Sequence, residues 1–204
     1  MNGMKQNKLV IGVDQSYTST GLSLCVNGKL TKVTSLKFKG LKSHTEKRNE
    51  LRRVLTLILT KASKKGYEIT IICERIRTFS DFGNKKDKSG GLRPGYLMMT
   101  GALIATIVDT GASFGIETYS VDTRAWKSKV VGSAKSKKDK DGKRDAKGET
   151  VEFVQKLGFD LFIREKKTGK NKGEAIYDDD AADSACIALY GFIQVKLQNL
   201  KLEE

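Results

Sequence analysis

The 204-residue sequence contains one histidine, one proline and three cysteines. Cys25, Cys73 and Cys186 stand alone inside apolar runs, without the C-x-x-C spacing of a zinc site or a disulfide framework, so we expect them to be reduced core residues. His44 lies among Ser, Thr, Lys and Glu at the start of a predicted helix, where we expect it at the surface. We therefore expect neither a histidine-based catalytic triad nor a histidine-rich metal site.

Long apolar runs are also lacking. No stretch reaches about 18 consecutive apolar residues, the length that would cross a bilayer. The N-terminal MNGMKQNK leads straight into a short apolar run, without a signal-peptide core. We expect a soluble, cytoplasmic protein with no membrane partner, and the length suits one domain over residues 1–204.

Charge is the most distinctive part of the composition. The 38 Lys and Arg residues outnumber the 24 Asp and Glu residues, giving a formal charge of +14. Such an excess favours a polyanionic partner through phosphate neutralisation, whereas the acids clustered near the C-terminus would repel that partner unless metal ions intervene. The composition thus favours a nucleic acid together with a divalent metal ion; a lysine-rich surface with no such partner is the alternative.

The acidic cluster lies in residues 176–189, with the sequence IYDDDAADSACIAL. In the helix that its alanines and apolar residues predict, Asp180 and Asp183 stand three residues apart and share a face. Asp178 and Asp179 suit a helix start, where the macrodipole favours carboxylates. Asp183 lies a full turn inside the helix, and a bound cation would explain it.

Two predicted strands also end in acids. KLVIGVD, residues 8–14, is an apolar run that ends in Asp14, and YEITIIC, residues 67–73, is followed by Glu74. If the two strands are neighbours, their acids converge at one edge of the sheet. An ion pair with Arg75 or Arg77 is the alternative explanation for Glu74.

Further strands and helices complete an α/β pattern. Asn27-Gly28 is a strong hairpin signal between strands 20–26 and 29–38, so three antiparallel strands open the domain. Helical spacing of apolar residues predicts helices near 43–63, 96–110 and 149–157, and another strand lies in 114–121.

Three basic segments separate these elements, near residues 76–95, 133–147 and 164–173, and we expect loops there. The first contains Phe79 and Phe82 among Lys and Arg residues, a mixture that can stack on unpaired bases while cations follow phosphates; phenylalanines that tuck back onto the domain are the alternative. Residues 133–145 are so rich in lysine that we expect disorder without a ligand.

Four motifs in order along the chain resemble the ribonuclease H-like superfamily, and within it the RuvC family of Holliday-junction resolvases. They are IGVDQSYTSTGLSL (11–24), IICER (71–75), WKSKVVG (126–132) and DDAADSACIAL (179–189). The resemblance spans nearly the whole chain and is strongest to bacteriophage-encoded members. It implies an α/β ribonuclease H-like fold, with a mixed five-stranded sheet flanked by helices, in the cytoplasm of the host if the chain is phage-encoded.

The resemblance also implies a site and an activity. The family's catalytic acids fall on Asp14, Glu74, Asp180 and Asp183, which would hold two Mg²⁺ ions, with Mn²⁺ as a substitute. The nearest matches to its catalytic basic residues are Lys127 and Lys147. Candidate DNA contacts are Arg75, Arg77, Phe79, Lys85, Lys86, Arg93 and Lys127.

The family's members are metal-dependent endonucleases that act as homodimers on four-way DNA junctions, and the helix near 96–110 is our candidate for the dimer contact. Where the family has a wedging aromatic, this sequence has Arg77, with Phe79 two residues further on, which implies a looser preference for branched DNA. Three other functions remain open: a nuclease for RNA–DNA hybrids, a non-catalytic DNA-binding module, and a sugar-kinase or actin-like ATPase. The ATPase would need roughly twice this length.

Overall fold

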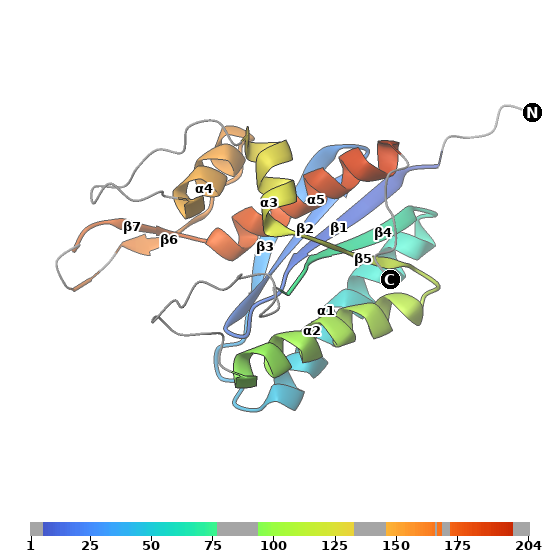
Figure 1. Cartoon of the computed structure of the whole chain (residues 1–204), viewed down its shortest axis with the longest axis horizontal. Coiled ribbons are helices and arrows are strands. Elements are labelled where there is room, and N and C mark those ends of the chain that lie inside the picture. Colours follow the sequence, from blue (N-terminus) through green and yellow to red (C-terminus); the bar gives the residue numbers. More distant parts are fainter. Residues whose placement is uncertain (1–5, 77–93, 133–145, 166, 169–171, 198–204) are drawn as a thin grey trace, which may run out of the picture.

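The structure is a computed structural model that describes residues 6–76, 94–132, 146–165, 167–168 and 172–197. A five-stranded sheet with strand order β3-β2-β1-β4-β5 forms its middle layer (Figure 1). The strands are β1 (Lys8–Asp14), β2 (Ser19–Val26), β3 (Lys29–Lys37), β4 (Glu68–Glu74) and β5 (Thr118–Val121). β1, β2 and β3 pair antiparallel, while β4 runs parallel to both β1 and β5. The predicted mixed sheet is confirmed.

Helices cover both faces of this sheet. They are α1 (His44–Lys64), α2 (Pro94–Ala112), α3 (Thr123–Trp126), α4 (Ala146–Lys156) and α5 (Asp179–Leu197). α1 and α2 lie on one face, and α5 crosses the other with α3 and α4 beside it (Figure 1). A π-helical turn, Lys127–Gly132, continues directly from α3.

β1 lies between two cores, which explains its unbroken apolar run. Leu9, Ile11 and Val13 point into the core beneath α1 and α2, whereas Val10 points into the core beneath α5. Gly12 shares the face of Val10, and a Cβ there would lie 2.5 Å from the backbone nitrogen of Ala188. The missing side chain therefore lets α5 pack closely on the sheet.

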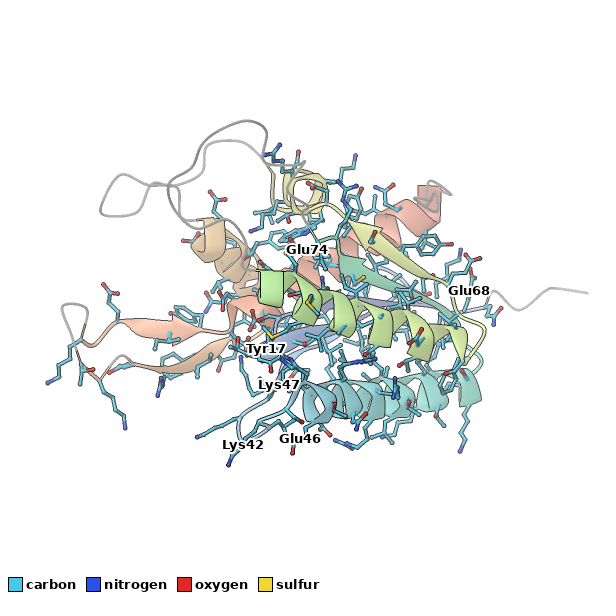
Figure 2. All side chains as sticks on the ribbon, turned by 60° about the horizontal axis from the view of Figure 1, so that its bottom comes forward. Tyr17, Lys42, Glu46, Lys47, Glu68 and Glu74 are labelled. Carbon is cyan, nitrogen blue, oxygen red and sulfur yellow. The ribbon has the colours of Figure 1, made fainter. Side chains whose placement is uncertain are left out.

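α1 begins where the sequence predicts. Ser43 is its N-cap, and the Ser43 and Glu46 side chains form a reciprocal capping box with each other's backbone N–H groups. His44, the first helical residue, is exposed as expected. Figure 2 shows Lys42 and Glu46 at this start of α1. The three cysteines are buried and free, as predicted.

A two-stranded antiparallel hairpin, β6 (Phe162–Glu165) and β7 (Ala175–Tyr177), projects beyond the sheet (Figure 1). The prediction of a basic loop over 164–173 is therefore wrong at its beginning, because Arg164 and Glu165 belong to β6. Phe162, Ile163 and the facing Ile176 and Tyr177 favour extended backbone, and pairing across the hairpin outweighs the neighbouring charges.

The other two basic segments are shorter than expected at their ends. α2 already begins at Pro94, a residue suited to the first helical position, and α4 begins at Ala146. The remainder of each segment lies outside the described residues. Within the described part of the chain, no helix is long and apolar enough to cross a membrane.

Candidate active site

Asp14 and Glu74 end two neighbouring parallel strands. The paired positions of β1 and β4 run up to Val13 opposite Cys73, so the next residue of each strand is an acid. Strand alternation places both acids on the face of Gly12 and Ile72, which is the face that α5 covers. Glu74 lies toward the same end of the molecule as Tyr17, whereas Glu68 marks the opposite end of β4 (Figure 2).

The start of α5 brings the other two acids to this edge. The Asp178 side chain caps the helix by accepting a hydrogen bond from the Ala181 backbone nitrogen at 3.1 Å, so its predicted role as a helix-start residue is confirmed. Gly21 in β2 makes room for the first turn, since a Cβ there would lie 1.9 Å from the Asp180 carbonyl oxygen. The position of Asp180 thus depends on a glycine in β2.

The electrostatics of Asp14 show that the four acids influence one another. Burial raises the pKa of Asp14 well above its usual range, and the negative charges of Glu74, Asp183 and Asp180 raise it further. A hydrogen bond between the Asp14 and Glu74 side chains acts in the same direction. Asp14 and Glu74 are therefore in direct contact, and Asp183 and Asp180 lie close enough to act on Asp14 electrostatically.

Asp183 is the most enclosed of the helix acids. Burial raises its pKa to about 6, against the opposing effects of the Lys127 ammonium and a hydrogen bond with Thr150. Lys127 Nζ lies 3.8 Å from Asp183 Oδ2, so the structure brings this predicted residue to the site. Asp183 Oδ1 is buried and has no hydrogen-bond partner. One oxygen of the carboxylate is thus left available to a ligand.

Asp180 has different partners from Asp183. Ser19 donates a hydrogen bond to Asp180 Oδ2, and Lys37 Nζ lies 4.0 Å from the same oxygen. Burial raises the pKa of Asp180, while the Ser19 hydrogen bond lowers it. The two acids share one side of α5, as predicted, but Asp180 is held by β2 and β3, and Asp183 interacts with Lys127 and Thr150.

Two polar residues that the sequence did not single out hold Glu74. Thr123 donates a hydrogen bond to Glu74 Oε1, and the Gln15 side-chain amide donates to the Glu74 carbonyl oxygen. Both residues lie just after strand ends, Gln15 directly after β1 and Thr123 two residues after β5. A search of the sequence for polar residues just after the predicted strand ends could therefore have identified Gln15 and Thr123.

A third unpredicted group fixes the loop after Asp14. Lys47 on α1 is buried, its Nζ lies 3.5 Å from the centroid of the Tyr17 ring, and it donates to the Tyr17 carbonyl oxygen at 3.2 Å. Figure 2 shows the two side chains together at the start of α1. A lysine within a charged helical stretch gives no sequence signal for this contact.

The remaining predicted site residues are placed only in part. Arg75 follows Glu74 and is exposed, and its backbone N–H donates to the Val121 carbonyl oxygen. Lys147 belongs to α4, but its side chain is outside the described part of the structure. Also outside the described residues are Arg77, Phe79, Phe82, Lys85, Lys86 and Arg93.

The donor atoms of the site suit a hard divalent cation. Carboxylate oxygens are the ligands that Mg²⁺ prefers. Asp183 Oδ1 has no hydrogen-bond partner, and a bound cation would relieve the repulsion between the negative charges of the acids. As the side chains lie, no three described His, Cys, Asp or Glu residues form a group that could hold a metal ion. Binding of a metal ion would therefore require some of these carboxylate side chains to rotate toward one another.

Comparison with known proteins gives matches at the level of structure. No protein-family model and no curated protein sequence matches this chain. A Thermus thermophilus RuvC in complex with a Holliday junction substrate superposes with a TM-score of 0.64 at 14% identity, over 95% of this chain and 98% of the other. Another T. thermophilus RuvC structure gives 0.62 at 15% identity, over the same shares of the two chains. The yeast mitochondrial Holliday junction resolvase Ydc2 gives 0.50 at 15% identity, over 97% and 84%. The chain therefore has the fold of these proteins.

Proposed function

We propose that this protein is a metal-dependent endonuclease that cleaves branched DNA, with four-way junctions as its main substrate. The observation that supports this most strongly is the arrangement of Asp14 and Glu74 at two adjacent strand ends, facing Asp183 from α5. The fold is shared with a RuvC whose structure contains a Holliday junction substrate. A formal charge of +14 suits a polyanionic substrate.

The four acids would hold one or two Mg²⁺ ions, with Mn²⁺ as a substitute. When bound, the metal would activate a water molecule and stabilise the leaving oxygen of the phosphodiester. The protein's own residues prepare this site: Thr123 orients the Glu74 carboxylate, and Ser19 orients that of Asp180. Lys127, beside Asp183, places a positive charge where a substrate phosphate would approach.

We further propose that the protein acts as a homodimer, because two strands of a junction must be cut symmetrically. α2 is the candidate contact. Met98 is 76% exposed and Val108 is 42% exposed, although the opposite side of the same helix buries Leu103 and Ile107. Size-exclusion chromatography at micromolar concentration should give a dimer, and a monomer would contradict this part of the proposal.

The nuclease function is tested with labelled four-way, three-way, flap, duplex and RNA–DNA hybrid substrates, each with Mg²⁺ and with EDTA. We expect Mg²⁺-dependent cuts near the branch point of the junctions and little cleavage of plain duplex. Asp183→Asn should abolish these cuts, whereas Glu68→Gln, an exposed position at the opposite end of β4 from Glu74, should leave them unchanged. Cleavage of the hybrid alone, or no cleavage with Mg²⁺ or Mn²⁺, would overturn the proposal.

A further inference from the structure

The β6–β7 hairpin carries two aromatic side chains that are exposed and lie outside the two cores of the sheet. Phe162 is 51% exposed and Tyr177 is 38% exposed. They are cross-strand partners, and their rings meet edge to face with centroids 6.3 Å apart. Ile163, which is 45% exposed, extends the apolar surface. Exposed apolar groups gathered on a projecting hairpin indicate a binding surface.

The root of this hairpin is fixed to the start of α5. Leu161, just before β6, is buried, and its carbonyl oxygen accepts a 2.8 Å hydrogen bond from the Asp178 backbone nitrogen. The Asp178 side chain in turn accepts hydrogen bonds from the Ala181 nitrogen and from Ser35 Oγ at 2.5 Å. Tyr177 therefore lies directly before the helix cap and three residues before Asp180, so the aromatic pair has a defined place beside the acids.

The hairpin is also basic. Its described residues include Arg164, Lys167 and Lys172 together with Glu165 and Glu174, and the sequence of residues 162–177 contains five Lys or Arg residues and two Glu residues in all. An open pocket of about 600 Å³ lies along it, lined by Phe162, Ile163, Arg164, Glu165, Lys167, Lys172 and Gly173. Aromatic rings beside cations are the combination that binds unpaired nucleotides, because the rings stack on bases while the cations contact phosphates.

We propose that Phe162 and Tyr177 form a stacking platform for bases that are unpaired or unstacked at the branch point of the DNA substrate. This inference rests on the proposed function and adds to it the element that recognises the branch. A fully paired duplex offers no free base to the platform, so the two residues should affect binding of branched DNA with unpaired bases and leave duplex binding unchanged.

Fluorescence of 2-aminopurine tests the platform without any cleavage. The base analogue is placed at an unpaired position of a branched DNA, and binding is measured in EDTA with wild type and with Phe162→Ala, Tyr177→Ala and the double variant. Wild type should quench the fluorescence by stacking. Each single substitution should weaken binding of this DNA by about 5- to 100-fold, with loss of quenching, and leave duplex affinity within about twofold.

Two further variants separate stacking from other effects. Phe162→Leu keeps an apolar side chain without the ring and should behave like Phe162→Ala, whereas Leu57→Ala removes an equally exposed apolar side chain from α1 and should bind like wild type. Unchanged quenching in the double variant, equal losses on branched and duplex DNA, or full rescue by Phe162→Leu would each overturn the proposal. A change in oligomeric state in the hairpin variants would also overturn it, because the surface would then be a contact between protein subunits.

The outcome is independent of the catalytic assignment, because binding is measured in EDTA. Failure of Asp183→Asn to abolish cleavage would overturn the proposed active site while leaving the stacking result intact. Circular dichroism should show the same global melting temperature for the hairpin variants as for wild type, because neither Phe162 nor Tyr177 belongs to the two cores of the sheet.

Discussion

Neutralising Asp183 should stabilise the metal-free protein while removing its activity. Burial raises the pKa of the Asp183 carboxyl to about 6 from its usual value of 3.8, so the folded state disfavours the ionised form. A group with a raised folded pKa contributes stability that is present below its unfolded pKa and is lost as the pH rises through the folded value. In the metal-free wild type, this loss should occur between about pH 4 and pH 7.

The expected size follows from the shift. A difference of about 2 pKa units corresponds to about 3 kcal/mol at pH 8, and this is an upper limit because the side chain keeps some exposure to water. In Asp183→Asn the side-chain oxygen can still accept a hydrogen bond from Thr150, whereas the new NH₂ group has no established acceptor. We therefore expect Asp183→Asn to raise the free energy of unfolding by about 1–3 kcal/mol at pH 8. At pH 4 the gain should fall to about 0.5 kcal/mol, because wild-type Asp183 is then largely protonated.

Urea unfolding followed by circular dichroism in EDTA, at pH 4 and pH 8, measures this gain. Asp109→Asn is the matched control, since the same substitution at an exposed position should change stability by less than about 0.5 kcal/mol at either pH. If Asp183→Asn is no more stable than wild type at pH 8, or if its advantage is the same at both pH values, the burial argument for Asp183 is wrong.

Three further predictions concern the supports of the site and its partner. Gly21→Ala should lower the free energy of unfolding by about 1–3 kcal/mol and the cleavage rate by about 100-fold, because the added Cβ would displace the backbone of Asp180. Gly95→Ala, where a Cβ meets no atom within 4 Å, should change neither quantity. Normal cleavage by Gly21→Ala would contradict the close approach of α5 to β2. Lys47→Met should destabilise by about 1–2 kcal/mol, measured by thermal unfolding, because the Tyr17 loop loses a cation–π contact and a hydrogen bond; an unchanged melting temperature would count against this. DNA affinity in EDTA should fall steeply between 50 and 200 mM salt, and a flat salt profile would refute the dominance of phosphate contacts.

The sequence predicts those parts of the fold that depend on neighbouring residues, namely the apolar runs of the strands and the start of a helix. The apolar run that ends in Asp14 and the one that ends before Glu74 are strands because β-branched residues buried on both faces leave few other possibilities. Asp178 was predictable as a helix-start residue for a similar reason, because the alanines behind it propagate a helix that needs a cap. Convergence of the acids then follows once the strands are neighbours.

Contacts between distant segments were not predictable in this way. Ser19 and Asp180 are 161 residues apart, and their hydrogen bond depends on how closely Gly21 lets α5 approach β2. The contact of Lys47 with Tyr17 likewise depends on where α1 packs. The β6–β7 hairpin was missed because its charges are typical of a loop, whereas pairing of Phe162 with Tyr177 depends on register.

The most direct test of the proposed active site compares cleavage and binding of one four-way junction by wild type and Asp14→Asn. Asp14 contacts Glu74 and is influenced by both helix acids, so its neutralisation should abolish Mg²⁺-dependent cleavage. Binding measured in EDTA should remain within about threefold of wild type, because we expect most of the affinity to come from contacts of basic residues with phosphates. Cleavage by Asp14→Asn at the wild-type rate would contradict the assignment of the site.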